Sequence, residues 1–432
     1  MVKKWVSLSF VSLLLFMTVL PIMNSIAISP TGVEKENSYY NYIIRVTSDD
    51  EFDDRYWIGN GTDEDPYVLI PKMFYGSYIE IRNTISHFVI TDLIIEAHGD
   101  PNYTESGIFP LELSNVTNGV IVNSVIKAFL WPYGFPYDLD DITGIKIDNS
   151  SGIVVEDCMI SDSGRGLWIS DSSNTFVTGN QILRNSIGID IDGSFNTTVF
   201  DNKIIENAEY GIRILEQSRN SSINGNYLGY NGVLNALDYE NSTVWDEGTQ
   251  GNYWDDYDES GVYNITGMGS NYDRFPQLLT QDVLPPDIEL SPNYGWGPYT
   301  TVCVTAGPGP VTPSFDAMVI DESGIDSVYL CISAGIYLKW YEMTQSSESD
   351  VYTYTFTDDY YYFNELYYVW ANDTEGNAWT SYLMKYYYEG YTTGSSTTPS
   401  SDGDIPFTYL TVGIFIALAV GVLVYICKAR ES

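Results

Sequence analysis

Branched aliphatic residues recur between residues 79 and 228 at offsets of 0, 2, 10 and 15. Six such sets occur, and one extra residue shifts the last two members of the sixth. All twenty-four positions hold Ile, Leu or Val: Ile79/Ile81/Val89/Ile94, Leu111/Leu113/Ile121/Ile126, Ile145/Ile147/Val155/Ile160, Leu167/Ile169/Val177/Ile182, Ile189/Ile191/Val199/Ile204 and Ile212/Ile214/Ile223/Leu228. Glycine precedes the last four sets, at Gly144, Gly166, Gly188 and Gly211. A repeat of about 22 residues predicts a solenoid.

The offset of two inside each set is the period of a β-strand, so both residues point to one face. A coil of about 22 residues has room for three short strands joined by bends, which is one turn of a parallel β-helix. Stacked coils would lie ~4.8 Å apart, with each inward position forming a column. We expect a right-handed winding and glycines that supply backbone angles other residues resist. A helical repeat would show apolar spacings of three and four residues, and these are absent.

Asparagines form a second repeat with the pattern N-x-[IL]-x-x-N. Its pairs are Asn180/Asn185, Asn202/Asn207 and Asn226/Asn231, and Cys158 falls in the first of the two columns. Asparagines stacked at a bend can bond to the coils above and below. This pattern predicts amide ladders along the solenoid.

The whole chain is predicted to be all-β apart from its ends. The β-helix covers 39–280, with an N-terminal cap at 39–75 and a C-terminal cap at 232–280, where Trp245, Tyr253 and Trp254 are suited to cover the open end. About seven short strands in 284–389 indicate an immunoglobulin-like β-sandwich. Residues 390–406 form a Ser/Thr-rich stalk that cannot build a core.

Both ends indicate export to the cell surface. Residues 1–27 have the charged start, apolar run and small-residue cleavage site of a signal peptide, although an uncleaved N-terminal anchor is an alternative. Residues 407–427 are apolar and long enough to span a bilayer as one transmembrane helix. The basic tail at 428–432 predicts a cytoplasmic C-terminus. We therefore expect a single-pass cell-membrane protein whose bulk is extracellular.

Charge and cysteine content limit the partners. The formal net charge is −39, with 19 basic and 58 acidic residues, which excludes nucleic acid as a partner. Four cysteines are too few for a disulfide scaffold, but Cys303 and Cys331 can pair outside the cell. Nine N-x-[ST] sequons predict an exported glycoprotein, at Asn60, Asn102, Asn115, Asn149, Asn196, Asn220, Asn241, Asn264 and Asn372.

The glycine-led coils with N-x-[IL]-x-x-N resemble the NosD-like, right-handed parallel β-helix repeats of secreted archaeal and bacterial proteins. GNGTDEDPYVL (59–69) is similar to the opening of those domains, and GNYWDDY (251–257) with FPQLL (275–279) to their closing elements. LYYVWANDTEGN (366–377) similarly resembles a strand of bacterial and archaeal Ig-like surface domains. The resemblance implies a β-helix over roughly 39–280.

Two properties of that family do not transfer to this sequence. The stretch 259–273 departs from the family's Asp/Gly-rich segment, so a calcium site is not carried over. The family name comes from a factor associated with copper delivery, and copper sites use His, Met or Cys ligands. This chain has two histidines, His87 and His98, and no cluster of such ligands. We therefore expect no copper role.

Outward positions on the first strand of each coil carry the candidate catalytic residues. Asp190 and Asp192 share a face and lie about 6.6 Å apart at ~3.3 Å per residue, at the lower edge of the ~6.5–9.5 Å between the carboxyls of inverting glycosidases. Trp168 can stack on a sugar, and Arg213 can hold an acidic one. The alternative is an ordinary solvated sheet face with alternating charges.

Two insertions, at 97–108 and 127–142, fall between the fourth column of one coil and the first of the next. They should project from the same corner of the solenoid. The second brings aromatic and acidic side chains that suit a carbohydrate ligand, namely Trp131, Tyr133, Tyr137, Asp140 and Asp141. The alternative is that these aromatics fold back to cover the flank of the solenoid.

Asp255, Asp256 and Asp258 lie beside the closing cap and can supply oxygen ligands to Ca²⁺. Charge crowding on an acidic surface is the alternative, and the sequence implies no other cofactor. Together the sequence favours a surface-anchored β-helix that binds carbohydrate, mediates adhesion or acts as a structural display element. Extracellular polysaccharide and surface-layer proteins are the expected partners. The alternative function is a polysaccharide hydrolase or lyase of the parallel β-helix type.

Overall fold

The computed structural model describes residues 43–52, 56–69, 72–76, 78–98, 109–129, 142–269, 271–291, 301–305, 314–334, 337–346, 350–356 and 365–389. Across these ranges the regular elements are β-strands, apart from one short 3-10 helix, η2 (Asp49–Glu51). No helix in the described part is long and apolar enough to cross a membrane. The predicted signal peptide, stalk, membrane span and tail lie outside the described residues.

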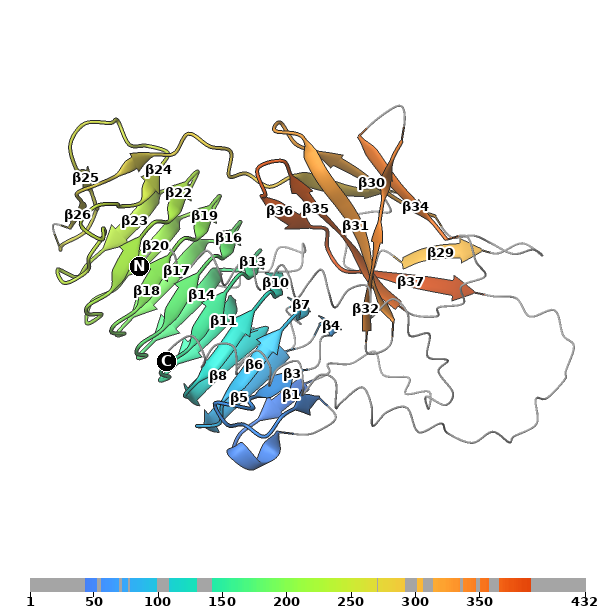
Figure 1. Ribbon diagram of the computed structural model, residues 1–432, viewed down its shortest axis with the longest axis horizontal. Coiled ribbons are helices and arrows are strands. Elements are labelled where there is room, and N and C mark those ends of the chain that lie inside the picture. The colour runs from blue at the N-terminus through green and yellow to red at the C-terminus, as the bar shows by residue number, and fades with distance from the viewer. Residues whose placement is uncertain are drawn as a thin grey trace, which may run out of the picture. The chain divides into compact units, whose positions relative to one another are not determined.

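Three sheets build a parallel β-helix, and each central coil contributes one strand to each sheet (Figure 1). Sheet A contains, in spatial order, β1 (Ile43–Val46), β5 (Tyr78–Thr84), β8 (Leu111–Val116), β11 (Thr143–Asp148), β14 (Arg165–Ser170), β17 (Ile187–Asp192), β20 (Tyr210–Ile214) and β23 (Leu234–Asp238). Its neighbouring strands all run parallel.

Sheets B and C complete each coil. Sheet B contains β2 (Trp57–Ile58), β3 (Tyr67–Leu69), β6 (Phe88–Thr91), β9 (Gly119–Val122), β12 (Val154–Glu156), β15 (Phe176–Thr178), β18 (Thr198–Phe200) and β21 (Ser222–Asn224). Sheet C contains β27 (Gln277–Leu278), β24 (Tyr253–Trp254), β22 (Tyr227–Gly229), β19 (Lys203–Ile205), β16 (Gln181–Leu183), β13 (Met159–Ser161), β10 (Val125–Phe129), β7 (Ile94–His98) and β4 (Met73–Tyr75). Only β2, which pairs antiparallel with β3, breaks the parallel pattern of these two sheets.

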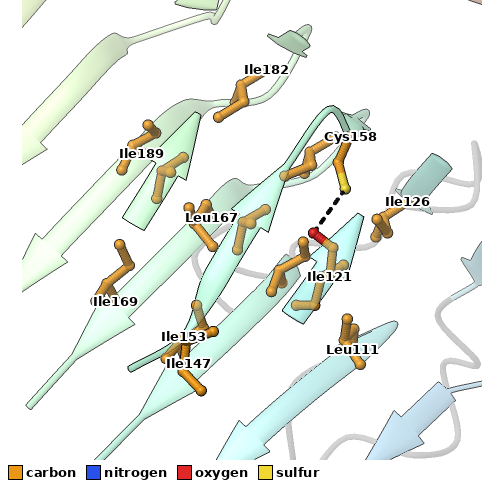
Figure 2. Close-up of a cluster of buried hydrophobic side chains, with 14 of the residues drawn as sticks. Leu111, Ile121, Ile126, Ile147, Ile153, Cys158, Leu167, Ile169, Ile182 and Ile189 are labelled. Carbon is orange, nitrogen blue, oxygen red and sulfur yellow. Dashed lines mark hydrogen bonds between the residues drawn. The ribbon is translucent and has the colours of Figure 1, made fainter. Parts of the chain in front are cut away.

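The predicted aliphatic columns form the core of the β-helix. Twenty-two of the twenty-four side chains are at most 1% exposed and belong to one buried cluster. Figure 2 shows several of them facing one another across the interior. The first coil contradicts the prediction at two positions. Ile90 and Ile95 align with Ile121 and Ile126, whereas Val89 points outward and Ile94 packs on the other face of sheet C. That coil carries one extra residue in its bend, as the sixth coil does.

The coil glycines are needed for space and not for unusual backbone angles, which corrects the sequence-based expectation. None of the four has a positive φ. A Cβ on Gly166 would lie 2.7 Å from the carbonyl oxygen of Gly188 and 2.8 Å from Nδ2 of Asn185. A Cβ on Gly188 would lie 2.5 Å from the carbonyl oxygen of Gly211. Glycine is therefore required because neighbouring coils approach each other closely at this bend.

The asparagine ladders are confirmed. Asn202 is fully buried; its Nδ2 donates to Oδ1 of Asn226 and to the carbonyls of Val177 and Phe200, and its Oδ1 accepts from Asn180. Asn185, Asn207 and Asn231 repeat the arrangement at the next bend. Cys158 continues the first ladder: Oδ1 of Asn180 accepts its backbone N–H, and its thiol donates to the carbonyl of Ile121, as Figure 2 shows. Burial raises the pKa of the Cys158 thiol to about 12.

Aromatic side chains close both ends of the core. Phe52, Trp57 and Phe88 form a ring cluster at the N-terminal end. Trp245 and Trp254 are buried at the C-terminal end, and their indole N–H groups donate to Asp238 and Asp273. The predicted capping tryptophans are thus confirmed, whereas Tyr253 stacks on Tyr227 outside the core. A small hairpin of β25 (Tyr263–Asn264) and β26 (Tyr272–Asp273) completes this cap.

Residues from 287 onward form two further sheets around a common core. One contains β28 (Asp287–Ser291), β30 (Ser314–Ile320), β34 (Val351–Thr355) and β33 (Thr344–Gln345). The other contains β29 (Thr301–Thr305), β37 (Met384–Glu389), β35 (Glu365–Asp373), β31 (Ile325–Ala334) and β32 (Tyr337–Glu342), with β36 (Ala378–Thr380) paired to β35. Buried residues of β30, β31, β34 and β35 share one cluster, so this segment is a β-sandwich. Its immunoglobulin type stays a prediction.

The structure contradicts a Cys303–Cys331 disulfide. Cys331 is a free, buried thiol on β31, and Cys303 lies on β29. Two strands, β37 and β35, separate β29 from β31 in their sheet. Three inter-strand spacings amount to about 14 Å, and a disulfide needs Cα atoms within ~7 Å.

Sheet C of the β-helix also contacts the sandwich. Lys127 of β10 is buried there, and its ammonium group donates to the carbonyl of Thr380 and lies 4.2 Å from the ring centroid of Trp379. Asp162 lies 3.8 Å from the same ammonium group, and Glu96 accepts a hydrogen bond from the N–H of Leu383. Sheet C is therefore occupied by protein, whereas the outer face of sheet A carries the candidate site.

Candidate functional site

The outer face of sheet A places one polar column beside another along the solenoid. Register aligns Glu112, Lys146, Trp168, Asp190 and Arg213 in one column. It aligns Arg82, Ser114, Asp148, Ser170 and Asp192 in the next. In the first column acidic side chains neighbour basic ones, as Glu112 does Lys146 and Asp190 does Arg213, which stabilises adjacent strands.

Asp190 is the centre of a buried ion cluster. Its side chain is 2% exposed, and Arg213 donates to it from Nε (2.9 Å) and Nη2 (2.7 Å). Nε of Arg165 also donates to Asp190, at 2.9 Å. Both carboxylate oxygens therefore accept hydrogen bonds from guanidinium groups. Such charge-assisted hydrogen bonds are shorter and stronger than those between neutral groups.

Trp168 lies beside this cluster with cations near its ring. The guanidinium carbon of Arg165 is 4.6 Å from the ring centroid, and the ammonium nitrogen of Lys146 is 5.2 Å away. Lys146 also forms an ion pair with Glu112 at 3.2 Å. The indole is half-buried, so part of it faces solvent together with these basic groups. Cation–π contacts of this kind fix the position of the ring.

Asp192 differs from Asp190 although only one residue separates them. Among the described residues its carboxylate accepts no hydrogen bond. Burial, followed by the charges of Asp190 and Asp171, raises the pKa of Asp192, and the positive charges of Arg213 and Arg165 oppose this shift. The structure thus brings the two sequence-predicted aspartates and Arg213 together, but it leaves only Asp192 with free acceptor oxygens.

Arg165 is the member of this site that the sequence interpretation missed. It lies at the start of β14, directly before the coil glycine, and aligns with Thr143 and Ile187. The interpretation followed the positions next to the aliphatic pair of each coil, and this position precedes them. An arginine one residue before the repeat glycine was the signal available.

The predicted aromatic groove lies outside the described residues. This applies to Trp131, Tyr133, Tyr137, Asp140 and Asp141, so their role stays a prediction. The strands that lead into the two insertions, β7 and β10, pair in register up to His98 and Phe129. The two strands that precede the insertions therefore end beside each other, and the projection of the insertions themselves stays a prediction.

The acidic residues of the closing cap are engaged within the protein. Asp255 and Asp256 both accept hydrogen bonds from Nδ2 of Asn235, and Asp258 accepts from Ser260 in its own turn. Within the described residues, the carboxylates that converge closely enough for a metal ion are a different set, Asp282, Asp321 and Asp373. Their candidate oxygens all lie within 4.8 Å of one another. Asn377 donates to Asp373, and the charge of Lys203 acts on Asp373 and Asp282.

A shallow depression of about 470 Å³ lies beside the C-terminal cap. Its lining residues include Asn220, Ser222, Ser242 and Arg274. The guanidinium of Arg274 is paired with the buried carboxylate of Asp246. Asn220, which lines the depression, is the asparagine of an N-x-[ST] sequon, so the depression lies at a predicted glycosylation site.

Residues 137–259 match the family model described as periplasmic copper-binding protein (NosD). The match spans the coils from β11 to β23 and the start of the closing cap, and it confirms the NosD-like resemblance of the β-helix over these residues. No curated protein matches the chain.

Two solved structures are similar to this chain. One is the A-module of mannuronan C-5 epimerase AlgE6 from Azotobacter vinelandii, at 11% identity and a TM-score of 0.25, covering 49% of this chain and 62% of that module. The chain thus spans less than two thirds of that module. The other is the enzymatically active domain of tailspike protein 2 from bacteriophage CBA120, at 10% identity and a TM-score of 0.23, covering 80% of this chain and 72% of that domain.

The metal-capable side chains in the described part of the chain do not fit copper. Copper favours imidazole, thiolate and thioether ligands. The convergent metal-capable group in the described part of the chain consists of carboxylates alone. Burial raises the pKa values of both described thiols, Cys158 and Cys331, which opposes thiolate formation. His87 lies at the surface, 3.7 Å from Asp63.

Proposed function

We propose that this chain is an exported, membrane-anchored protein whose β-helix is a rigid carbohydrate-binding and display module. The binding surface is the outer face of sheet A around Trp168. The N-terminal leader, the C-terminal apolar segment and the sequons of the sequence support the location. A stack of short strands with amide ladders supports the rigidity.

One observation carries the binding half of this proposal. Trp168, Lys146, Arg165, Arg213 and Asp192 lie together on the outer face of sheet A, and all five residues remain partly exposed. Basic and acidic groups are balanced there, although the chain as a whole has 19 basic and 58 acidic residues. An aromatic surface surrounded by hydrogen-bonding charged groups suits a sugar polymer, and basic groups favour an acidic one.

The hydrogen bonds that Asp190 accepts favour binding over hydrolysis as the function of this face. Hydrolysis by two carboxylates requires one to donate a proton and the other to act as base or nucleophile. Two guanidinium groups occupy both oxygens of Asp190. Asp192 alone remains accessible as a proton-transfer group, so a polysaccharide hydrolase or lyase is the second candidate.

Binding of the exported full chain to a panel of neutral and acidic polysaccharides tests the proposal. Trp168→Ala should weaken binding roughly tenfold, which is about 1.4 kcal/mol. Phe176→Ala is the matched control, because Phe176 is a half-buried aromatic on the outer face of sheet B. Absence of binding to every polysaccharide, or equal losses in the two variants, would contradict a site at Trp168.

The second candidate is separated from the first by product formation. Release of reducing ends or unsaturated sugars from a bound polysaccharide, lost in Asp192→Asn, would establish an enzyme. Binding without product, retained at least in part by Asp192→Asn, would leave the binding module as the function.

A further inference from the structure

Exposed sequon asparagines collect at one bend of the β-helix. We define the A–B bend as the end of each sheet A strand together with the segment that follows it on the way to sheet B. Five sequons occur on this bend, and all five asparagine side chains are exposed: Asn115, Asn149, Asn196, Asn220 and Asn241. Three further described sequons lie elsewhere, at Asn60, Asn264 and Asn372, and Asn102 lies outside the described residues.

The strand register places these asparagines in neighbouring coils. Ser114 aligns with Asp148, so Asn115 and Asn149 follow at equivalent positions of consecutive coils. Phe195 aligns with Arg219, which puts Asn196 beside Asn220. The N–H of Asn220 donates to Oγ of Ser242, so Asn241 belongs to the next coil. The five sites therefore form two runs along one edge, with successive coils ~4.8 Å apart.

Asparagines at the other two bends have a different role. Asn180, Asn202, Asn226, Asn185 and Asn207 are buried and form the amide ladders. None of these five is followed by x-Ser or x-Thr. Asparagine side chains therefore form hydrogen bonds inside the solenoid at two bends, whereas the sequon asparagines of the third bend face solvent.

We propose that the A–B bend is an N-glycosylated edge of the β-helix. In the transfer step, Nδ2 of the asparagine attacks the anomeric carbon of a lipid-linked oligosaccharide. A C–N bond forms, the bond from that carbon to the lipid phosphate breaks, the phosphate leaves, and Nδ2 loses one proton. The remaining N–H can keep its role, as where Asn196 donates to Asn174.

The local structure accommodates the modification. The hydroxyl residue of each sequon lies beside its asparagine at the surface, and Thr198, for example, is half-buried and outward on β18. The depression lined by Asn220, Ser222 and Ser242 leaves room for a first sugar residue. Sugars along this edge would shield the A–B bend while leaving the outer face of sheet A open. This inference does not depend on the polysaccharide ligand proposed above.

Glycopeptide mass spectrometry of the exported full chain, from a host with an N-glycosylation pathway, tests the proposal. We expect sugar on at least one asparagine of each run, Asn115/Asn149 and Asn196/Asn220/Asn241. An exported chain with all five asparagines unmodified would overturn the proposal.

A matched pair of variants tests whether the sequon itself is read. Thr198→Val keeps the branched shape but removes the acceptor hydroxyl, and it should abolish modification of Asn196. Thr198→Ser keeps the hydroxyl and should retain it. If Asn196 carries the same amount of sugar in both variants, while both are exported and folded, sequon-directed transfer at this edge is ruled out.

Discussion

Asp190 and Asp192 show how neighbouring carboxylates on one strand acquire opposite properties. Asp190 is buried between Arg165 and Arg213. Asp190→Asn should therefore destabilise the protein by about 3 kcal/mol, because removing one partner of a buried ion cluster leaves uncompensated charge. Urea denaturation at neutral pH measures this loss. An unchanged midpoint would mean that the two guanidinium groups find other partners or water.

Asp192 should respond in the opposite direction. Its pKa is raised in the folded state, so the unfolded chain loses its proton at lower pH. Its contribution to stability is therefore present at pH values below ~3.9 and is lost as pH rises through the raised pKa. Asp192→Asn should increase the urea midpoint at pH 7, and the gain should vanish in acid. A gain that is independent of pH would contradict this origin.

At the residue scale, the sequence predicted which side chains lie together more accurately than it predicted what each of them does. Alternation along a strand correctly placed Trp168, Asp190, Asp192 and Arg213 on one face. It could not predict that Asp190 is enclosed, because Arg165 reaches it from the start of the neighbouring strand β14. The burial of Asp190 depends on contacts with side chains of neighbouring coils, and the alternation along a single strand does not predict such contacts.

The first asparagine ladder defines the stability of the element that carries the site. Asn202→Ala would leave buried groups of Asn180, Asn226 and Val177 without partners, at about 1–3 kcal/mol each. Cys158→Asn should instead add about 1 kcal/mol, because an amide at that position can donate to the carbonyl of Ile121 and accept from the coil before. Thermal unfolding of the two variants is the measurement. A destabilised Cys158→Asn variant would show that the interior is too narrow there for an amide.

The repeat made most of the solenoid predictable from sequence. A strict column of Ile, Leu and Val has one inward face, so five of the six coils were placed in register. The first coil slipped by one residue because Val89 and Ile90 are both β-branched and only stacking distinguishes them. The role of the coil glycines was also wrong in detail. A close approach to Gly188 depends on the neighbouring coil and is not visible within one.

At the scale of the whole molecule, strands of the sandwich could be predicted from sequence but their contact with sheet C could not. The N–H groups of Ala378 and Leu383 donate to Gln181 and Glu96, which lie 197 and 287 residues away in the sequence, and no periodicity connects them. Lys127 illustrates the difficulty. Its place in an outward column indicates a solvated side chain, and only the tertiary structure makes it a buried one.

Lys127 should therefore couple the two parts energetically. Burial lowers the pKa of its ammonium group, while the carboxylates of Asp162 and Glu96 oppose that shift. Lys127→Ala would leave those acids buried without their counter-ion, at about 3–5 kcal/mol. Differential scanning calorimetry should then resolve separate transitions for the β-helix and the sandwich. Arg219→Ala, at an exposed position of the A–B bend, should change stability by less than about 1 kcal/mol. A single transition at unchanged temperature in Lys127→Ala would mean that this contact does not bind the sandwich to sheet C.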